Sequence, residues 1–319
     1  MSTSTHRRTR WRRAAATALA AAASALAIAH AQPAHAAPCC ISATSFGVGR
    51  LLIWEDFAVG VQLGHSRYLG EYDASGVLRL NPARYHEGLS QIQPWAIVRA
   101  SKRIQVEGWV PLLLNDRTSD GTRQVAGGLG DVSAAGRFEF VGVGEVLGFP
   151  SFAVTLGATA PTVRRVEQTS PPLFAGTTGR GAWAGSIAIE SEYARMPWFV
   201  RLDAGASFSL PFTRPDTGQR QLYGPVVRVG LSAGREVVRD VAVIAVAAQS
   251  EIEGNTRLDG AVVPGSVAYS LSVAASLSWR VGDHWTLVGG LNNSVWPSHL
   301  AKNRDAQIGF TFGARYGHF

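Results

Sequence analysis

The sequence is poor in lysine, in cysteine and in long apolar runs. Lys102 and Lys302 are its two lysines, although 46% of the chain is apolar and 35 residues are glycine. After residue 36 no uninterrupted apolar run approaches the roughly 18–20 residues of a transmembrane helix. The longest is 241–248, whose β-branched content favours a strand. Such a composition is typical of a soluble β protein or of a membrane β-barrel. The distribution of apolar and polar residues between the two faces of each strand distinguishes the two classes.

The two cysteines, Cys39 and Cys40, are adjacent. Partners at the spacing of a zinc site or a haem-attachment motif are missing, so the sequence predicts no metal and no cofactor. Pro38 occupies the position where a lipoprotein signal needs a small residue. A vicinal disulfide is one option, and the role of the pair stays open.

Residues 1–36 have the pattern of a cleaved export signal. An alanine-rich apolar stretch over 14–29 and a small-residue cleavage site over 34–36 follow a basic start that has no acidic residue. The alternative, a membrane-anchoring helix, requires a longer apolar core. The basic start consists of Arg7, Arg8, Arg10, Arg12 and Arg13.

Removal of this signal changes the charge of the chain. The whole chain is formally +7, and the predicted mature part is only +2. Because most of the basic excess lies in the signal, nucleic-acid binding is excluded as a function.

The mature part alternates with period two, as a β-strand with one apolar face does. In 198–212 every even position is apolar, from Trp198 to Phe212, whereas the odd positions include Arg201 and Asp203. The stretch 267–280 repeats the pattern with the parity reversed. Both segments exceed a typical soluble strand and carry aromatic residues near their ends, which favours a lipid-facing wall.

We therefore predict an all-β fold, a transmembrane antiparallel up-and-down β-barrel of about twelve strands, with ten to fourteen as the range. Short and long connections alternate along the chain, and lipid requires such a sheet to close. The predicted strands are 56–69, 90–100, 103–114, 130–142, 149–162, 181–194, 198–212, 223–235, 241–253, 265–281, 285–296 and 305–318.

This pattern predicts the outer membrane of a Gram-negative bacterium, with both termini periplasmic and membrane lipid around a barrel of residues 55–319. Residues 37–54 form either a periplasmic segment or a small plug, because 41–53 is rather apolar for a free tail. The terminal strand, which alternates and ends in Phe319, resembles the signal by which outer-membrane barrels are recognised for assembly, which implies recognition by the barrel-assembly machinery. In an unbroken strand its apolar series, which ends at Tyr316, lies on the face opposite to Phe319. Either a bulge near Gly317 turns Phe319 to the apolar face, or Tyr316 serves as the terminal aromatic residue.

The residues that alternate with the apolar ones are predicted to line the inner wall. Their charges would either pair and fill the barrel or form a constriction that selects solutes. The predicted lining residues are Gln93, Arg99, Gln105, Glu107, Asp131, Arg137, Glu139, Glu190, Glu192, Arg201, Asp203, Arg228, Gln249, Glu251, Arg280 and Arg315.

An enzymatic barrel is the weaker hypothesis. His65 and Ser66 are adjacent and therefore point to opposite faces of a strand, which does not suit a hydrolase pair. His86 and Asp73 could meet at the outer rim, as a barrel protease would require. We predict no catalytic residue.

The run 128–138, with Gly128, Gly130 and Asp131 followed by Arg137-Phe138, resembles a family of proteobacterial outer-membrane barrels associated with the meta-cleavage pathway of phenol degradation. The turn 281–285 is similar to the tight turns of that family. The resemblance implies a channel for small solutes, among them hydrophobic or aromatic compounds. Trp95 and Trp109, on the inward parity, would then contact an aromatic solute.

Three functions therefore compete: a channel or transporter for a small-molecule solute, a closed structural or adhesive barrel, and a barrel hydrolase. The sequence predicts neither the identity of the solute nor the oligomeric state.

Overall fold

The computed structural model describes residues 50–82, 84–165, 168–294 and 301–319. The predicted signal peptide, Cys39 and Cys40 lie outside the described residues. No helix in this part of the chain is long and apolar enough to cross a membrane.

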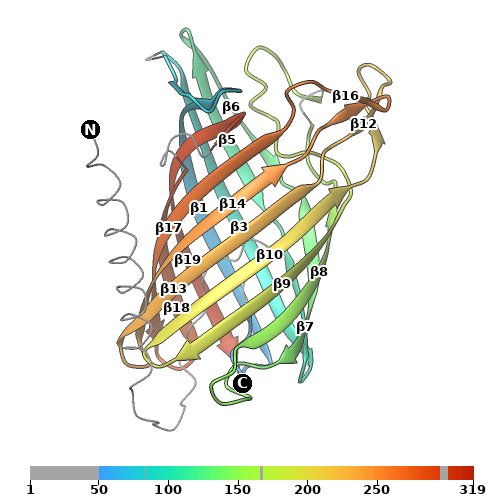
Figure 1. Ribbon diagram of the computed structural model, residues 1–319. Helices are drawn as coiled ribbons and strands as arrows, with labels where there is room; N and C mark the ends of the chain where they lie inside the picture. The colour runs from blue at the N-terminus through green and yellow to red at the C-terminus, as the bar shows by residue number, and fades with distance from the viewer. Residues whose placement is uncertain (1–49, 83, 166–167, 295–300) are drawn as a thin grey trace, which may run out of the picture. The chain divides into compact units, whose positions relative to one another are not determined.

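Twelve antiparallel wall strands form the barrel (Figure 1). Two of them are interrupted and carry two labels each. In chain order the wall strands are β1 (Phe57–Tyr72), β3 (His86–Ser101), β4 (Ile104–Trp109) with β5 (Leu112–Ser119), β6 (Thr122–Leu129) with β7 (Val132–Val141), β8 (Ser151–Ala160), β9 (Ala184–Arg195), β10 (Trp198–Ser209), β13 (Val226–Val238), β14 (Ala242–Glu253), β17 (Ala268–Val281), β18 (Trp285–Asn293) and β19 (Arg304–His318).

Closure is made by β1, which pairs with β3 on one side and with β19 on the other. The interruption between β4 and β5 is bridged, because the Val110 amide donates to the Pro94 carbonyl at 3.1 Å. The Gly130 amide likewise donates to the Pro111 carbonyl at 2.7 Å, opposite the gap between β6 and β7. The hydrogen-bonded wall is therefore continuous around the barrel.

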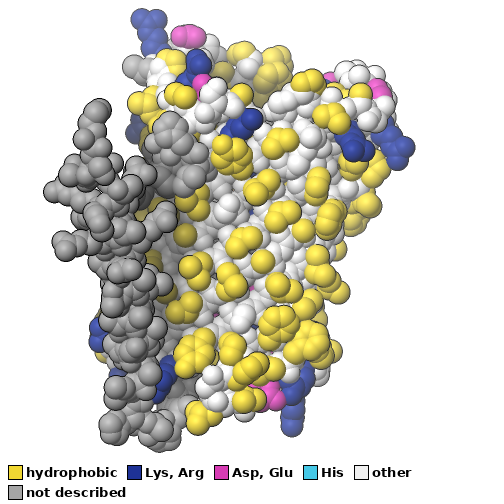
Figure 2. Space-filling model, viewed as in Figure 1, with side chains coloured by type: hydrophobic (Ala, Val, Ile, Leu, Met, Phe, Trp, Pro, Cys, Tyr) yellow, Lys and Arg dark blue, Asp and Glu magenta, His cyan; other side chains and the backbone are white. Residues whose placement is uncertain are grey.

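The predicted alternation of faces is confirmed. On β10, Val200 and Leu202 are about half exposed on the outer face, whereas Arg201 and Asp203, which alternate with them, are buried on the inner face. Figure 2 shows apolar side chains spread over the middle of the outer wall and charged ones gathered toward both ends. A wall with this band is suited to acyl chains.

The two ends of the barrel differ. At one end, here called the turn end, short turns join the strands, and both the start of β1 and the C-terminus lie there (Figure 1). At the other, the loop end, the connections are longer, apart from the two-residue turn between β5 and β6. They carry β2 (Leu78–Leu80) and a separate four-stranded sheet of β11 (Phe212–Thr213), β12 (Arg220–Leu222), β15 (Arg257–Leu258) and β16 (Ala261–Val262).

The prediction of a long connection over 115–129 was wrong. β5 and β6 continue through this stretch and meet in a two-residue turn, Asp120-Gly121, whose φ values of 48° and 83° are both positive. Such a turn matches the twist of a hairpin. The strands escaped prediction because both of their faces are polar: Asp116 pairs with Arg123 on the outer face, and Asn115 points inward.

The C-terminal strand needs no bulge near its end. β1 and β19 pair without interruption from Phe57 opposite His318 to Tyr68 opposite Gln307. Tyr316 therefore stays on the outer face, and the Phe319 ring lies 4.9 Å from the His284 ring. Of the two alternatives for the terminal aromatic residue, the bulge is wrong.

Candidate functional site: the barrel lumen

Several of the predicted lining residues are buried on the inner face of the wall. Gln105, Glu107, Glu190, Glu192 and Arg315 are all buried, although they lie on strands whose outward neighbours are exposed. Arg280 lies at the turn end, where its guanidinium donates to the carbonyls of the 282–284 turn.

One group of charges on β7, β9 and β10 forms a compact network. Glu190 accepts from Arg201 at 2.9 Å and from Arg137 at 3.2 Å through the same carboxylate oxygen. Arg137 also pairs with Glu139, which accepts a hydrogen bond from Gln105 at 3.2 Å. These charges are buried or nearly so and pair with one another, which favours the ion-pair interpretation for this part of the lumen.

The N-terminal segment, here Arg50–Glu55, enters the lumen at the turn end. Arg50 pairs with Glu192 on β9 at 3.1 Å, and Glu55 binds Arg315 on β19 through both carboxylate oxygens. Because β9 and β19 belong to different sides of the barrel, these two ion pairs carry the segment across the lumen.

An apolar contact and three hydrogen bonds hold the same segment. Leu51 is 3% exposed and packs with Trp95 and Ile97. Its amide donates to the side chain of Gln105 at 2.9 Å, and Arg99 donates to the carbonyls of residues 52 and 55 at 2.6 and 2.8 Å. The segment is thus bound by backbone, charge and packing together.

A second charged network lies at the loop end. Glu251 accepts from Arg228 and Arg304, and Glu253 accepts from Arg304 and Arg180, each at 2.7 Å or less. Arg180 belongs to the connection between β8 and β9, so this ion pair ties that connection to β14.

The connection between β8 and β9 also packs against the inner face of β5. Asn115 donates to the carbonyls of Ala175 and Thr177 at 2.8 and 2.6 Å, and Arg117 donates to that of Leu173 at 2.9 Å. The connection therefore folds into the loop end of the barrel.

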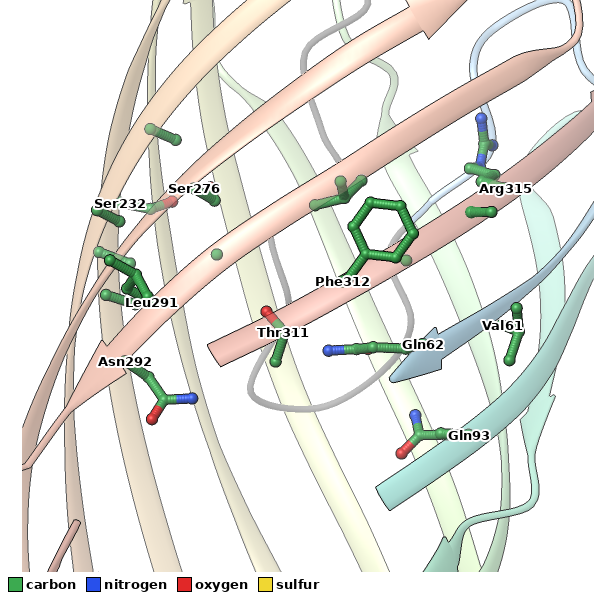
Figure 3. Close-up of a pocket in the computed structure, with 18 of the residues that line it drawn as sticks. Val61, Gln62, Gln93, Ser232, Ser276, Leu291, Asn292, Thr311, Phe312 and Arg315 are labelled. Carbon is green, nitrogen blue, oxygen red and sulfur yellow. The ribbon is translucent and has the colours of Figure 1, made fainter. Parts of the chain in front are cut away.

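Two cavities lie between the charged networks. The smaller, of about 320 Å³, is bounded by β13, β14, β17, β18, β19, β1 and β3 (Figure 3). Figure 3 shows Gln62, Gln93 and Thr311 on neighbouring strands at its edge. Alanine, glycine and serine dominate the opposite side.

The larger cavity, of about 420 Å³, is bounded by β7 to β10 and extends to Trp109 on β4, which pairs with β7, and to Gln93 on β3, the next strand. Trp95 and Trp109 are direct neighbours across β3 and β4. Trp95 lines the smaller cavity and Trp109 the larger, and Gln93 lines both. The indole pair therefore stands where the two cavities approach each other.

Sequence reasoning missed five participants in these networks: Arg50, Glu55, Arg180, Glu253 and Arg304. Glu253 and Arg304 lie at the ends of strands, where the alternation fades. The others lie outside the wall strands, where no periodicity indicates a direction.

The residues of the enzymatic hypothesis are not assembled. His65 points outward, where its Nδ1 lies 3.0 Å from the Ser90 hydroxyl. Asp73 accepts from the Val77 amide and the Arg79 guanidinium, which hold its pKa below the usual value, and within the described residues no hydrogen bond joins it to His86. Nor do the described residues include a group of three His, Cys, Asp or Glu placed to hold a metal ion.

No family model and no curated protein matches this sequence. Among solved structures, an outer membrane channel from Pseudomonas putida F1 matches with a TM-score of 0.69 at 13% identity, over 84% of this chain and 97% of that one. The chain has the fold of an outer-membrane β-barrel. The β domain of a Bordetella autotransporter, at 12% identity, and the NanC porin, at 8%, match less closely, with TM-scores of 0.49 and 0.47 over 82% and 81% of this chain and 100% and 98% of theirs.

Proposed function

We propose that this protein is an outer-membrane channel that passes small solutes through the lumen of its barrel. The observation that carries the proposal is the pair of cavities inside the wall, which share Gln93 and lie between the two charged networks. The Pseudomonas structure of the same fold is described as an outer membrane channel. In this arrangement the turn end and both termini are periplasmic.

The test is single-channel conductance of the refolded mature protein in a planar bilayer. We expect stable openings from the wild type. We expect Arg201→Ala to change the ion selectivity, because the negative charge of Glu190 is then neutralised by one arginine fewer. Heat-modifiable gel mobility establishes that the sample is folded. A folded protein that leaves the bilayer tight would overturn the proposal in favour of the closed structural or adhesive barrel, which the buried ion pairs also suit.

Within this proposal, aromatic compounds are one solute class. The resemblance of 128–138 implies it, and the inward Trp95–Trp109 pair offers two indole faces. Each aromatic contact contributes of the order of 1 kcal/mol. We expect Trp95→Ala with Trp109→Ala to slow toluene or phenol uptake roughly threefold to tenfold.

Trp285→Ala is the matched control for this pair, because Trp285 is half exposed on the outer face of β18. It should leave uptake unchanged. If the double variant took up toluene and phenol at the wild-type rate, the tryptophans would have no role in transport.

A further inference from the structure

The inner wall of β7 to β10 carries a group of hydroxyl side chains. Two adjacent rows of paired residues cross these four strands, and all eight of their side chains are small. One row consists of Ser133, Thr159, Ala184 and Ser209, and the other of Ala135, Gly157, Ser186 and Ser207. The five hydroxyl residues among them, Ser133, Thr159, Ser186, Ser207 and Ser209, are here called the hydroxyl patch.

The small side chains of these two rows leave space inside the barrel, whereas the neighbouring rows carry larger side chains that fill it. The next rows toward the turn end include Arg137, Glu190 and Asp203. The hydroxyl patch lines the larger cavity, whose volume of about 420 Å³ falls within the range of small-molecule sites. The space is therefore a consequence of residue size in these two rows.

The hydroxyl patch has unused hydrogen-bonding capacity. Ser186 and Ser207 face each other across β9 and β10, and within the described chain neither hydroxyl has a hydrogen-bond partner. Ser133 and Thr159 lie 2.9 Å apart and bond to each other, which leaves acceptor capacity on both. Each hydroxyl can both donate and accept, so the patch suits a ligand whose own groups do both.

The two arginines that line this cavity are already in ion pairs. Arg180 binds Glu253 at 2.7 Å, and Arg228 binds Glu251. The carboxylate of Asp131 accepts hydrogen bonds from backbone amides of the β8–β9 connection, and its Oδ1 is buried without a hydrogen-bond partner among the described residues. An ionic ligand would have to compete with these pairs, whereas an uncharged one would not.

We infer that the larger cavity binds an uncharged polyhydroxylated solute the size of a single sugar ring. Its hydroxyl groups would bond to the hydroxyl patch and to Gln93, and its C–H face would lie against the indole of Trp109, which lies directly opposite Ser133 on the neighbouring strand β4. The inference rests on the proposed function only in that such a solute would be the one passed through the lumen.

The test uses D-glucose as the probe and measures binding separately from conduction. Saturation-transfer NMR on the folded protein in micelles should show transfer to D-glucose. In Ser186→Ala with Ser207→Ala the affinity should fall roughly tenfold or more, since two hydrogen bonds are lost. Ser276→Ala, which removes a serine from the smaller cavity, is the matched control and should bind as the wild type does.

The same samples are then placed in planar bilayers, where glucose should reduce the current through the wild type but not through the double variant. Glucose binding in a tight bilayer would overturn the channel and leave the binding site standing. Stable openings without saturation transfer to glucose would overturn the inference and leave the channel standing. Saturation transfer to phenol but not to glucose would also overturn the inference alone. If gel mobility shows that the double variant is not folded, Ser209→Ala takes its place, and its affinity for glucose is expected to be severalfold lower than that of the wild type.

Discussion

Deletion of residues 41–53 is expected to raise the single-channel conductance roughly twofold or more, because it clears the turn end of the lumen. The deletion removes Arg50 and Leu51, and with them the ion pair to Glu192 and the packing against Trp95. It keeps Glu55, so that Arg315 retains its partner. We propose on this basis that the N-terminal segment is a plug rather than a free periplasmic tail.

Charge alone could alter the conductance, and Arg239→Ala controls for it. Arg239 lies in the exposed turn between β13 and β14, and its loss removes one positive charge from the turn end without touching the N-terminal segment. This variant should conduct as the wild type does. Equal conductance of the deletion and the wild type would mean that the segment does not limit the flow of ions.

Glu190→Ala is expected to lower the free energy of unfolding by about 3–5 kcal/mol, because it removes the carboxylate that two buried guanidinium groups share. Arg201 is 3% exposed and donates to Glu190, and Arg137 is 6% exposed and donates to both Glu190 and Glu139. Denaturant unfolding in micelles, followed by gel mobility and tryptophan fluorescence, measures the change.

The control for Glu190 is an ion pair in contact with water. Asp216 pairs with Arg214 at 2.7 Å in the connection that follows β11, and Asp216→Ala should leave the unfolding transition where it is. A Glu190→Ala variant as stable as this control would mean that water enters the network and solvates the arginines.

The fold was predictable because lipid and lumen impose opposite demands on adjacent residues. Val200 and Leu202 on one parity and Arg201 and Asp203 on the other can be satisfied only by a wall with one apolar and one polar face. Closure follows from the need to pair every backbone group in hydrocarbon. The prediction failed at 115–129, where the strands leave the apolar band and no demand of lipid maintains the alternation.

The candidate site was predictable in its members but not in its contacts. The parity of β9 and β10 places Glu190 and Arg201 on the same face, yet which charges meet depends on how neighbouring strands are staggered. The same stagger brings Ser186 opposite Ser207 and creates the space of the larger cavity. Period-two patterning determines which face each residue occupies and excludes one-residue slips, but it does not select among pairings that differ by two residues.

The sequence by itself determined the all-β class, the outward and inward parity of the wall strands and a strand number of about twelve, because these depend on the chemistry of adjacent residues. Tertiary structure alone decided that Glu55 meets Arg315, that Arg50 reaches Glu192 and that the β8–β9 connection enters the loop end. Those contacts join residues far apart in the chain. Their partners are selected by closure of the barrel, which brings together surfaces that no local pattern describes.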